Sequence, residues 1–149
     1  ACALGDARGC SLAGMVLASG RLGRPDLAGA EARWAEGCDA GDGLGCSALG
    51  MRRIRQRRPA EAQPLFEKAC EGGHAAGCAQ AGDMRRLLMT PDYAGAVPLY
   101  RKACDGDFAP GCVALAELTQ AGQGTAADPA AAARLKQKAC DLGLREACP

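Results

Sequence analysis

The sequence is short of the residues that usually fill a globular core. Aromatic side chains make up 3% of its 149 residues, and Ile54 is the only isoleucine. Alanine, with 33 copies, and glycine, with 21, take up much of the chain instead. Strands draw on β-branched and aromatic side chains, whereas alanine is the best helix former. The composition disfavours a strand-rich fold and predicts an all-α chain, whose helices approach closely and bury alanine and leucine.

The sequence also has no long apolar run and no marked excess of positive or negative charge. No stretch approaches the roughly 20 apolar residues that span a bilayer, so we expect no membrane insertion. The start, Ala1 to Asp6, has neither the basic nor the apolar part of a signal peptide, and it lacks an initiator methionine. We therefore expect that a signal peptide, an upstream region or both have been removed or left out. With 18 basic and 17 acidic side chains the net charge is +1, which argues against nucleic acid as a partner.

Ten cysteines form five pairs, and the two members of each pair are always eight positions apart. Successive pairs follow after 36, 32, 34 and 36 residues. A period in this range is typical of solenoids built from helix–turn–helix repeats. The cysteines therefore mark the repeats, at positions 2 and 10, 38 and 46, 70 and 78, 104 and 112, and 140 and 148.

Each cysteine pair brackets a turn. Residues eight apart are separated by about 12 Å along a helix and about 26 Å along a strand, whereas a disulfide needs Cα atoms within about 7 Å. Turn-forming residues stand between the cysteines, so the chain can reverse there. We predict five local disulfides, each joining the end of one helix to the start of the next: Cys2–Cys10, Cys38–Cys46, Cys70–Cys78, Cys104–Cys112 and Cys140–Cys148.

The predicted bridges would place the protein in an oxidising compartment, secreted or periplasmic. Free buried thiols and a metal site remain as alternatives. A metal site is disfavoured because structural zinc ligands are usually two to four residues apart, and His74 is the only histidine. We therefore expect no metal and no cofactor.

The cysteine positions predict a single repeat domain over 1–149. Cutting at the second cysteine of each pair gives a remnant, 1–9, and four repeats, 10–45, 46–77, 78–111 and 112–147. Each repeat is expected to contain a helix A, which starts at the cysteine, and a helix B, which leads to the next pair. A helix B before Cys2 and a helix A after Cys148 are missing, so we expect a piece of a longer array.

Helix B has recurring features. Its predicted aspartate N-caps stand twelve residues before the next cysteine, at Asp26, Asp92 and Asp128, whereas Arg58 breaks this pattern in the second repeat. Pro59 and Pro129 follow at the first helical position, where a missing N–H costs nothing. The first cysteine of each pair, which follows helix B, is called the closing cysteine. Four residues before it stand Trp34, Phe66, Tyr100 and Lys136. A stripe of aromatic residues at helical spacing is usually buried, so we predict that the first three lie in the core between repeats.

The motif Lys-Ala-Cys-Asp/Glu recurs before the turns, from Lys68 to Glu71, from Lys102 to Asp105 and from Lys138 to Asp141. With the αα period and the cysteines eight apart, it resembles the Sel-one-like repeat family. More narrowly the chain is similar to its disulfide-bridged branch, typified by the Helicobacter cysteine-rich proteins. The resemblance implies a right-handed α/α superhelix, exported from a bacterial cell, that serves as an interaction scaffold. It also implies an alternative, because members of that branch have been described as penicillin-binding or weak β-lactamases.

The residues themselves offer little catalytic chemistry. A penicillin-type nucleophile needs a lysine three residues after the serine, but Ser11, Ser19 and Ser47 are followed at that distance by glycine or leucine. His74 stands in a tight turn and is expected to be solvated there. We therefore predict no catalytic residue and no enzyme, with β-lactam binding or hydrolysis as the competing hypothesis.

Arginines stand out in this nearly neutral chain. Counted from the second cysteine of each pair, Arg53 and Arg85 occupy the same position of helix A. In αα solenoids this helix lines the concave face. We predict a groove that binds a protein or peptide with an acidic segment, with a monomeric chain as the binding species. The predicted binding residues are Arg52, Arg53, Arg55, Arg85 and Arg86. The competing hypothesis is a solvated charged face, balanced by Glu61, Glu67 and Asp83.

Overall fold

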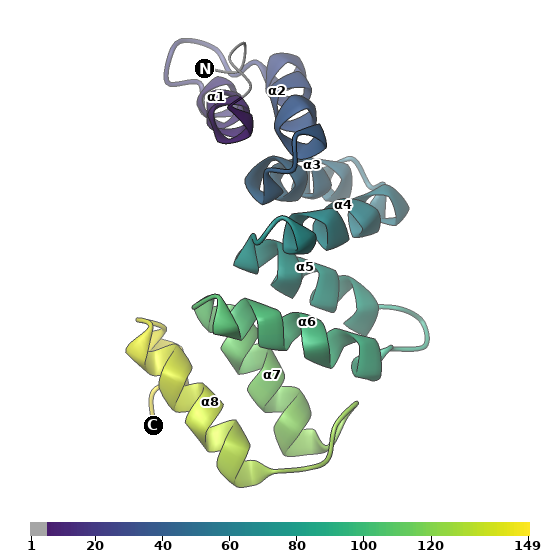
Figure 1. Cartoon of the computed structure of the whole chain (residues 1–149), viewed down its shortest axis with the longest axis vertical. Coiled ribbons are helices and arrows are strands. Elements are labelled where there is room, and N and C mark those ends of the chain that lie inside the picture. Colours follow the sequence, from purple (N-terminus) through teal and green to yellow (C-terminus); the bar gives the residue numbers. More distant parts are fainter. Residues whose placement is uncertain (1–5) are drawn as a thin grey trace. The chain divides into compact units, whose positions relative to one another are not determined.

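The computed structural model describes residues 6–149, which form eight α-helices, one short 3-10 helix and no strand (Figure 1). The elements are α1 (Ala7–Ser19), α2 (Leu27–Asp39), α3 (Gly43–Arg55), α4 (Pro59–Glu71), α5 (Ala75–Arg86), α6 (Tyr93–Asp105), α7 (Ala109–Ala121), α8 (Pro129–Asp141) and η2 (Arg145–Ala147). The chain divides into two compact units, residues 1–77 and 78–149, with the boundary inside α5. The predicted all-α class is confirmed.

Consecutive helices pair into hairpins within each unit. In the first unit α1 packs on α2, α2 on α3 and α3 on α4, and α1 also contacts α3. In the second unit α7 lies between α6 and α8, and η2 packs against α8. Odd-numbered helices are the predicted helices A and even-numbered ones the helices B. This is the architecture of an α/α solenoid of helix–turn–helix repeats.

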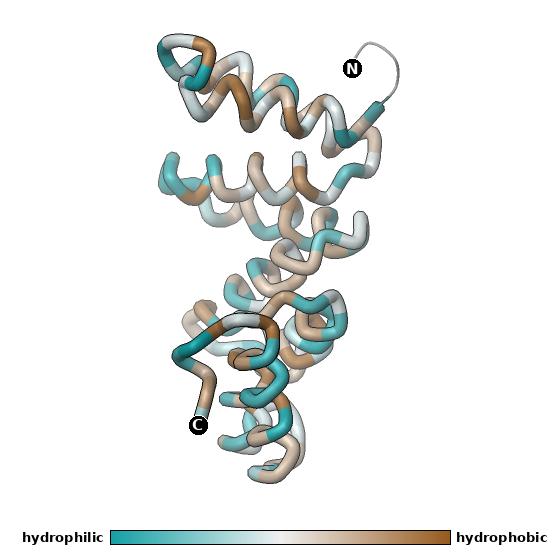
Figure 2. Tube along the Cα trace, turned by 90° about the vertical axis from the view of Figure 1, so that its left-hand side faces the viewer, coloured by the Kyte–Doolittle hydropathy of each residue, from teal (hydrophilic) through white to brown (hydrophobic). Residues whose placement is uncertain are grey.

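Apolar positions are spread along every helix and do not gather in long runs (Figure 2). None of the described helices combines the length and the apolar character that crossing a membrane requires. The cores are small and rich in alanine and cysteine. One in the first unit holds Ala30, Trp34 and Leu49, and one in the second holds Cys104, Ala109, Cys112 and Ala139.

The expected helix starts are confirmed for helix B and shifted for helix A. Asp26, Asp92 and Asp128 each accept a hydrogen bond from a backbone N–H three residues on, at 2.9, 2.8 and 2.8 Å. Arg58 stands at the N-cap of α4 without such a bond, and a proline opens α4 and α8. The helices A begin three residues before the cysteine, as α3 does at Gly43, because the turn is shorter than the sequence suggested.

One turn is repeated after α2, α4, α6 and α8. Three residues after the closing cysteine the backbone has a positive φ, at Gly41, Gly73, Asp107 and Gly143. The next N–H then donates to the carbonyl of the residue before that cysteine, for example Asp42 N to Gly37 O at 2.9 Å. This pattern satisfies helix-terminal carbonyls in the manner of a Schellman motif. It brings the next helix back beside the closing cysteine.

Disulfides close three of these turns. Cys38–Cys46, Cys104–Cys112 and Cys140–Cys148 are present, with Cα–Cα distances of 4.5, 4.5 and 4.8 Å. Cys10, Cys70 and Cys78 are also disulfide-bonded, and no described cysteine is free. Three predicted bridges are thereby confirmed. The pairing Cys70–Cys78 would join the two units and stays a prediction, and Cys2 of the predicted Cys2–Cys10 bridge lies outside the described residues.

We predict that the purified protein contains five local bridges and no thiol. Thiol titration in denaturant without reductant should detect no free sulfhydryl, and peptide mapping should recover Cys2 with Cys10 and Cys70 with Cys78. Replacing Cys38 and Cys46 together by alanine should lower the free energy of unfolding by about 2 to 3 kcal/mol, because a loop of about nine residues is opened. A thiol at Cys70 or Cys78, or any non-local pair, would contradict this pattern.

The aromatic residues of helix B are buried against glycines of helix A. Trp34, Phe66 and Tyr100 are 5, 2 and 0% exposed. A Cβ added to Gly14, Gly50 or Gly82 would lie 2.6 to 2.8 Å from the ring atoms of Trp34, Phe66 or Tyr100, respectively. The predicted burial is confirmed, and the structure adds that each ring packs against its own hairpin. Where Lys136 replaces the aromatic residue, helix A has Ala116 in place of the glycine.

We predict that Gly50→Ala destabilises the protein by about 1 to 3 kcal/mol, because the new methyl group overlaps the ring of Phe66. Helix propensity alone predicts the opposite, a gain of about 1 kcal/mol. The same substitution in a Phe66→Leu background should cost less, since the smaller side chain leaves room. Urea unfolding of the four proteins of this cycle measures the coupling, and a Gly50→Ala variant more stable than wild type would refute the steric explanation.

Candidate functional site

Two neighbouring arginines of α3 bind one carboxylate of α2. Arg52 Nε lies 2.6 Å from Glu31 Oε1, and Arg53 Nη1 lies 3.0 Å from Glu31 Oε2. Gln56 completes the group, since its Nε2 donates to Glu31 Oε1 at 3.1 Å and its Oε1 accepts from Arg53 Nη1 at 2.8 Å. These four residues, Glu31, Arg52, Arg53 and Gln56, are called the Glu31 cluster below. The cluster ties α2 to α3.

The Glu31 cluster is partly buried, and the side chain of Glu31 is 23% exposed. The hydrogen bond from Arg52 is the main cause that lowers the pKa of Glu31 below its ordinary value of 4.5, and Arg53 adds to this against the opposing effect of burial. Arg53 Nε also lies 3.5 Å from Glu61 Oε2. The two guanidinium groups are therefore held in place by carboxylates of the chain itself.

The arginines of the second unit are paired as well. Arg85 Nη1 lies 2.9 Å from Asp92 Oδ2, and Arg86 Nη1 lies 3.0 Å from Glu117 Oε2. Asp92 also caps α6, so Arg85 fixes the end of α5 to the start of α6. Arg53 and Arg85 belong to different units, and their position in one groove stays a prediction.

The three acidic residues expected to balance the arginines have several polar contacts. Glu61 binds Arg53 and Arg58, Glu67 accepts from Gln63 at 3.4 Å, and Asp83 accepts from the Tyr100 hydroxyl at 2.6 Å. Sequence reasoning missed Glu31, which stands 21 and 22 residues before its two arginines. No motif marks it, because it is a single charged residue on the outer part of a helix in the preceding repeat.

Arg55 is the exception among the five predicted binding residues. Its side chain is exposed, and no carboxylate in the described part of the chain pairs with it. It lies at a cavity of about 380 Å³ in the first unit. This cavity, called the methionine pocket below, is lined by Met15, Ala18 and Ser19 of α1, Trp34 of α2, and Leu44, Ser47, Ala48, Met51 and Arg55 of α3.

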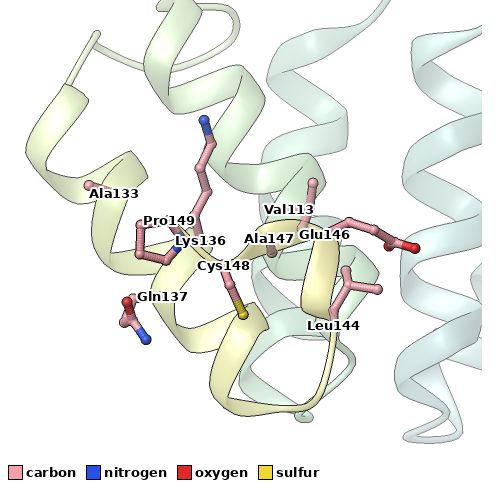
Figure 3. Close-up of a pocket in the computed structure, with 9 residues that line it drawn as sticks. All are labelled: Val113, Ala133, Lys136, Gln137, Leu144, Glu146, Ala147, Cys148 and Pro149. Atoms are coloured by element: carbon pink, nitrogen blue, oxygen red, sulfur yellow. The ribbon is translucent and has the colours of Figure 1, made fainter.

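A second cavity, of about 640 Å³, lies in the second unit between α7, α8 and the segment after α8 (Figure 3). Val113, Leu144 and Ala147 supply apolar surface, and the Lys136 and Glu146 side chains extend away from each other at its edges. Lys136 Nζ donates to Gln120 at 3.0 Å. The sulfur of Cys148 is held in its disulfide and offers no thiol.

Two of the three serines are buried, and the third is bonded to the backbone. Ser11 and Ser47 are 0 and 6% exposed, and Ser19 Oγ donates to the Val16 carbonyl at 2.8 Å. His74 lies in the predicted turn but is half-buried, and burial is the main cause that lowers its pKa. No group of three or more potential metal ligands is found among residues 6–149. The absence of an enzymatic activity stays a prediction.

Solved structures of bacterial repeat proteins superpose on the chain. A Sel1 repeat protein from Oxalobacter formigenes gives a TM-score of 0.84 at 19% sequence identity over 96% of this chain. A protective antigen of uropathogenic Escherichia coli with an SLR fold gives 0.85 at 21% identity, also over 96%. Cysteine-rich protein B of Helicobacter pylori gives 0.66 at 27% identity over 83%. The chain has the Sel1-like repeat fold.

This Sel1-like repeat fold is the one that the cysteine spacing and the Lys-Ala-Cys motif implied. The chain spans 59% of the Oxalobacter protein, 32% of the Escherichia coli antigen and 93% of the Helicobacter protein. No protein-family model and no curated sequence matches it. The relationship is thus carried by the arrangement of the helices.

We predict that Glu31→Gln lowers the free energy of unfolding by about 1 to 2 kcal/mol at pH 7, because it removes a charged acceptor from two arginines. The pKa of Glu31 is lowered in the folded state, so its contribution is complete above the ordinary value of 4.5 and is lost as the pH falls below it. The difference between wild type and variant should therefore shrink in acid.

Urea unfolding at several pH values measures this difference. Glu71→Gln is the matched control, because Glu71 is exposed and forms no ion pair within the described chain. We expect it to change the free energy of unfolding by less than about 0.5 kcal/mol. A Glu31→Gln difference that is the same at pH 3 and pH 7 would show that the charge of Glu31 does not stabilise the fold.

Proposed function

We propose that this protein is a secreted or periplasmic repeat scaffold that binds a protein or peptide through the face formed by its helices A. One observation carries the proposal. Leu12, Met15 and Val16 of α1 are 50, 46 and 38% exposed. Their spacing puts them on one side of the helix, where they form an apolar stripe. Contiguous exposed apolar surface is typical of sites that bind other proteins.

The stripe continues onto α3. Met15 also lines the methionine pocket, whose other wall includes Met51 and Arg55. The helices α1 and α3 are both helices A, and they contact each other within the first unit. In αα solenoids these helices line the concave face, which supports the proposal that a partner lies in that groove.

The oxidised cysteines support the proposed compartment. All nine cysteines in the described part of the chain are disulfide-bonded. Stable disulfides are rare in reducing compartments and common in exported proteins. The similarity to a cysteine-rich protein of Helicobacter pylori is consistent with this location.

The arginines support a partner with acidic groups. Arg52, Arg53, Arg85 and Arg86 are each paired inside the chain, but a guanidinium has five N–H donors and can bind a second carboxylate. Arg55 has no carboxylate partner in the described chain, so its N–H donors remain available to a partner. We therefore propose that Arg55 makes the most direct contact with an acidic partner and that the other four add positive charge around it.

A peptide-display selection against the purified protein tests the proposal. We expect peptides that carry acidic and apolar residues and whose binding weakens as salt rises, since exposed charges are screened over about 8 Å at physiological ionic strength. The double variant Leu12→Ser, Val16→Ser should bind them roughly tenfold more weakly, because two half-exposed apolar contacts are lost. Its stability should change little, as both side chains face solvent.

Leu22→Ser is the matched control for this variant. Leu22 is 84% exposed but lies in the α1–α2 loop, away from the stripe. Equal binding by wild type and the double variant would place the partner elsewhere. Turnover of a chromogenic β-lactam well above the buffer rate would favour the competing enzymatic hypothesis.

A further inference from the structure

The methionine pocket is lined by side chains that can adjust to the shape of a ligand. Met15 of α1 and Met51 of α3 both line it and are 46 and 38% exposed. Methionine is unbranched and polarisable, so it fits side chains of different shape and is common at surfaces that bind several peptides. Ala18 and Ala48 keep the space between the helices open. A volume of about 380 Å³ is within the range of ligand pockets and far more than a water molecule needs.

A positive charge stands at the same pocket. Arg55 follows Met51 by one helical turn, so both side chains leave α3 on the same side. Arg53 is nearly opposite on the helix and is bound to Glu31 and Glu61. Arg55 is the one arginine in the pocket lining, and a carboxylate from outside can reach it without displacing a carboxylate of the described chain.

Trp34 forms part of the pocket wall. It is 5% exposed and lines the pocket, and its buried Nε1–H has no acceptor in the described part of the chain. This nitrogen lies against Gly14, which is outside the pocket lining. Trp34 therefore contributes apolar ring surface to the pocket.

We propose that the methionine pocket takes an apolar side chain of an extended peptide segment, and that Arg55 pairs with a carboxylate one or two residues away in the same segment. This specificity rests on the proposed function and adds to it the chemical class of the partner at one site. A leucine or methionine side chain suits the apolar walls. An aspartate or glutamate nearby complements the charge of Arg55.

Short acetylated peptide amides are the probes. Acetyl-Leu-Gly-Asp amide carries both features, acetyl-Leu-Gly-Asn amide lacks the charge, and acetyl-Gly-Gly-Asp amide lacks the apolar side chain. The chain contains one tryptophan, Trp34, and four methionines, Met15, Met51, Met84 and Met89. Tryptophan fluorescence and the NMR signals of labelled methionine methyl groups therefore report on the pocket residue by residue.

Titration of the first peptide should shift the methyl signals of Met15 and Met51 and change the fluorescence of Trp34. The signal of Met89 should stay in place, because Met89 is fully exposed in the α5–α6 loop. The other two peptides should bind more weakly. Arg55→Ala should weaken binding of the aspartate peptide roughly twofold to fivefold, as for an exposed ion pair, and leave that of the asparagine peptide unchanged.

Arg57→Ala is the control for the loss of a charge, and Met89→Ala is the control for the loss of a methionine. Arg57→Ala removes the same charge from an exposed residue outside the pocket and should bind the aspartate peptide like wild type. Met51→Ala should weaken the binding of both leucine peptides, whereas Met89→Ala should not. All four substituted residues are solvent-exposed, so the variants are expected to fold.

The proposal is overturned if the aspartate peptide shifts neither Met15 nor Met51 at millimolar concentration, or if Arg55→Ala binds the aspartate and asparagine peptides like wild type. A stronger response to decanoate than to any peptide would assign the pocket to a fatty acid and also overturn it. These results leave the proposed function intact where display-selected peptides still depend on Leu12 and Val16, which lie outside the pocket lining.

Discussion

The disulfide-closed turn between helix B and the next helix A is the constraint on which the rest of the structure depends. Helices of 12 or 13 residues are marginal alone, and here they carry few large side chains to hold them together. The Cys38–Cys46 bridge and Ala69 make up one core cluster, and Cys104 and Cys112 belong to another. The bridges thus serve both as covalent links and as core side chains.

Much of this fold could be predicted because the informative residues act locally. A cysteine spacing of eight, an aspartate before a helix and a glycine or aspartate in a turn each restrict the backbone within a few positions. The starts of the helices A were predicted three residues late, since the first turn of helix begins before the cysteine. The packing of Phe66 on Gly50 could also have been predicted from the sequence. The aromatic residue of helix B is replaced, by Lys136, only in the repeat whose helix A has Ala116 in place of the glycine.

The candidate site was less predictable because it depends on contacts between distant residues. The arginine-rich end of α3 was evident, but the partner of Arg52 and Arg53 is Glu31 on another helix. A single glutamate in a helix has many possible partners, and side-chain rotamers decide among them. The methionine pocket was missed for a related reason. Met15 and Met51 are unremarkable apart, and only the packing of α1 beside α3 brings them to one cavity.

The same helix uses its arginines for two purposes, and the first supports the second. Glu31 and Trp34 are three residues apart on α2, so both face the same neighbour, α3. By binding Arg52 and Arg53, Glu31 fixes the distance between α2 and α3 and hence the position of Trp34 in the wall of the methionine pocket. Because the position of Trp34 is fixed before binding, this wall of the pocket loses little conformational freedom when a ligand binds. The ion pairs of Arg52 and Arg53 with Glu31 therefore stabilise the wall of the pocket at which Arg55 has no carboxylate partner from the described chain.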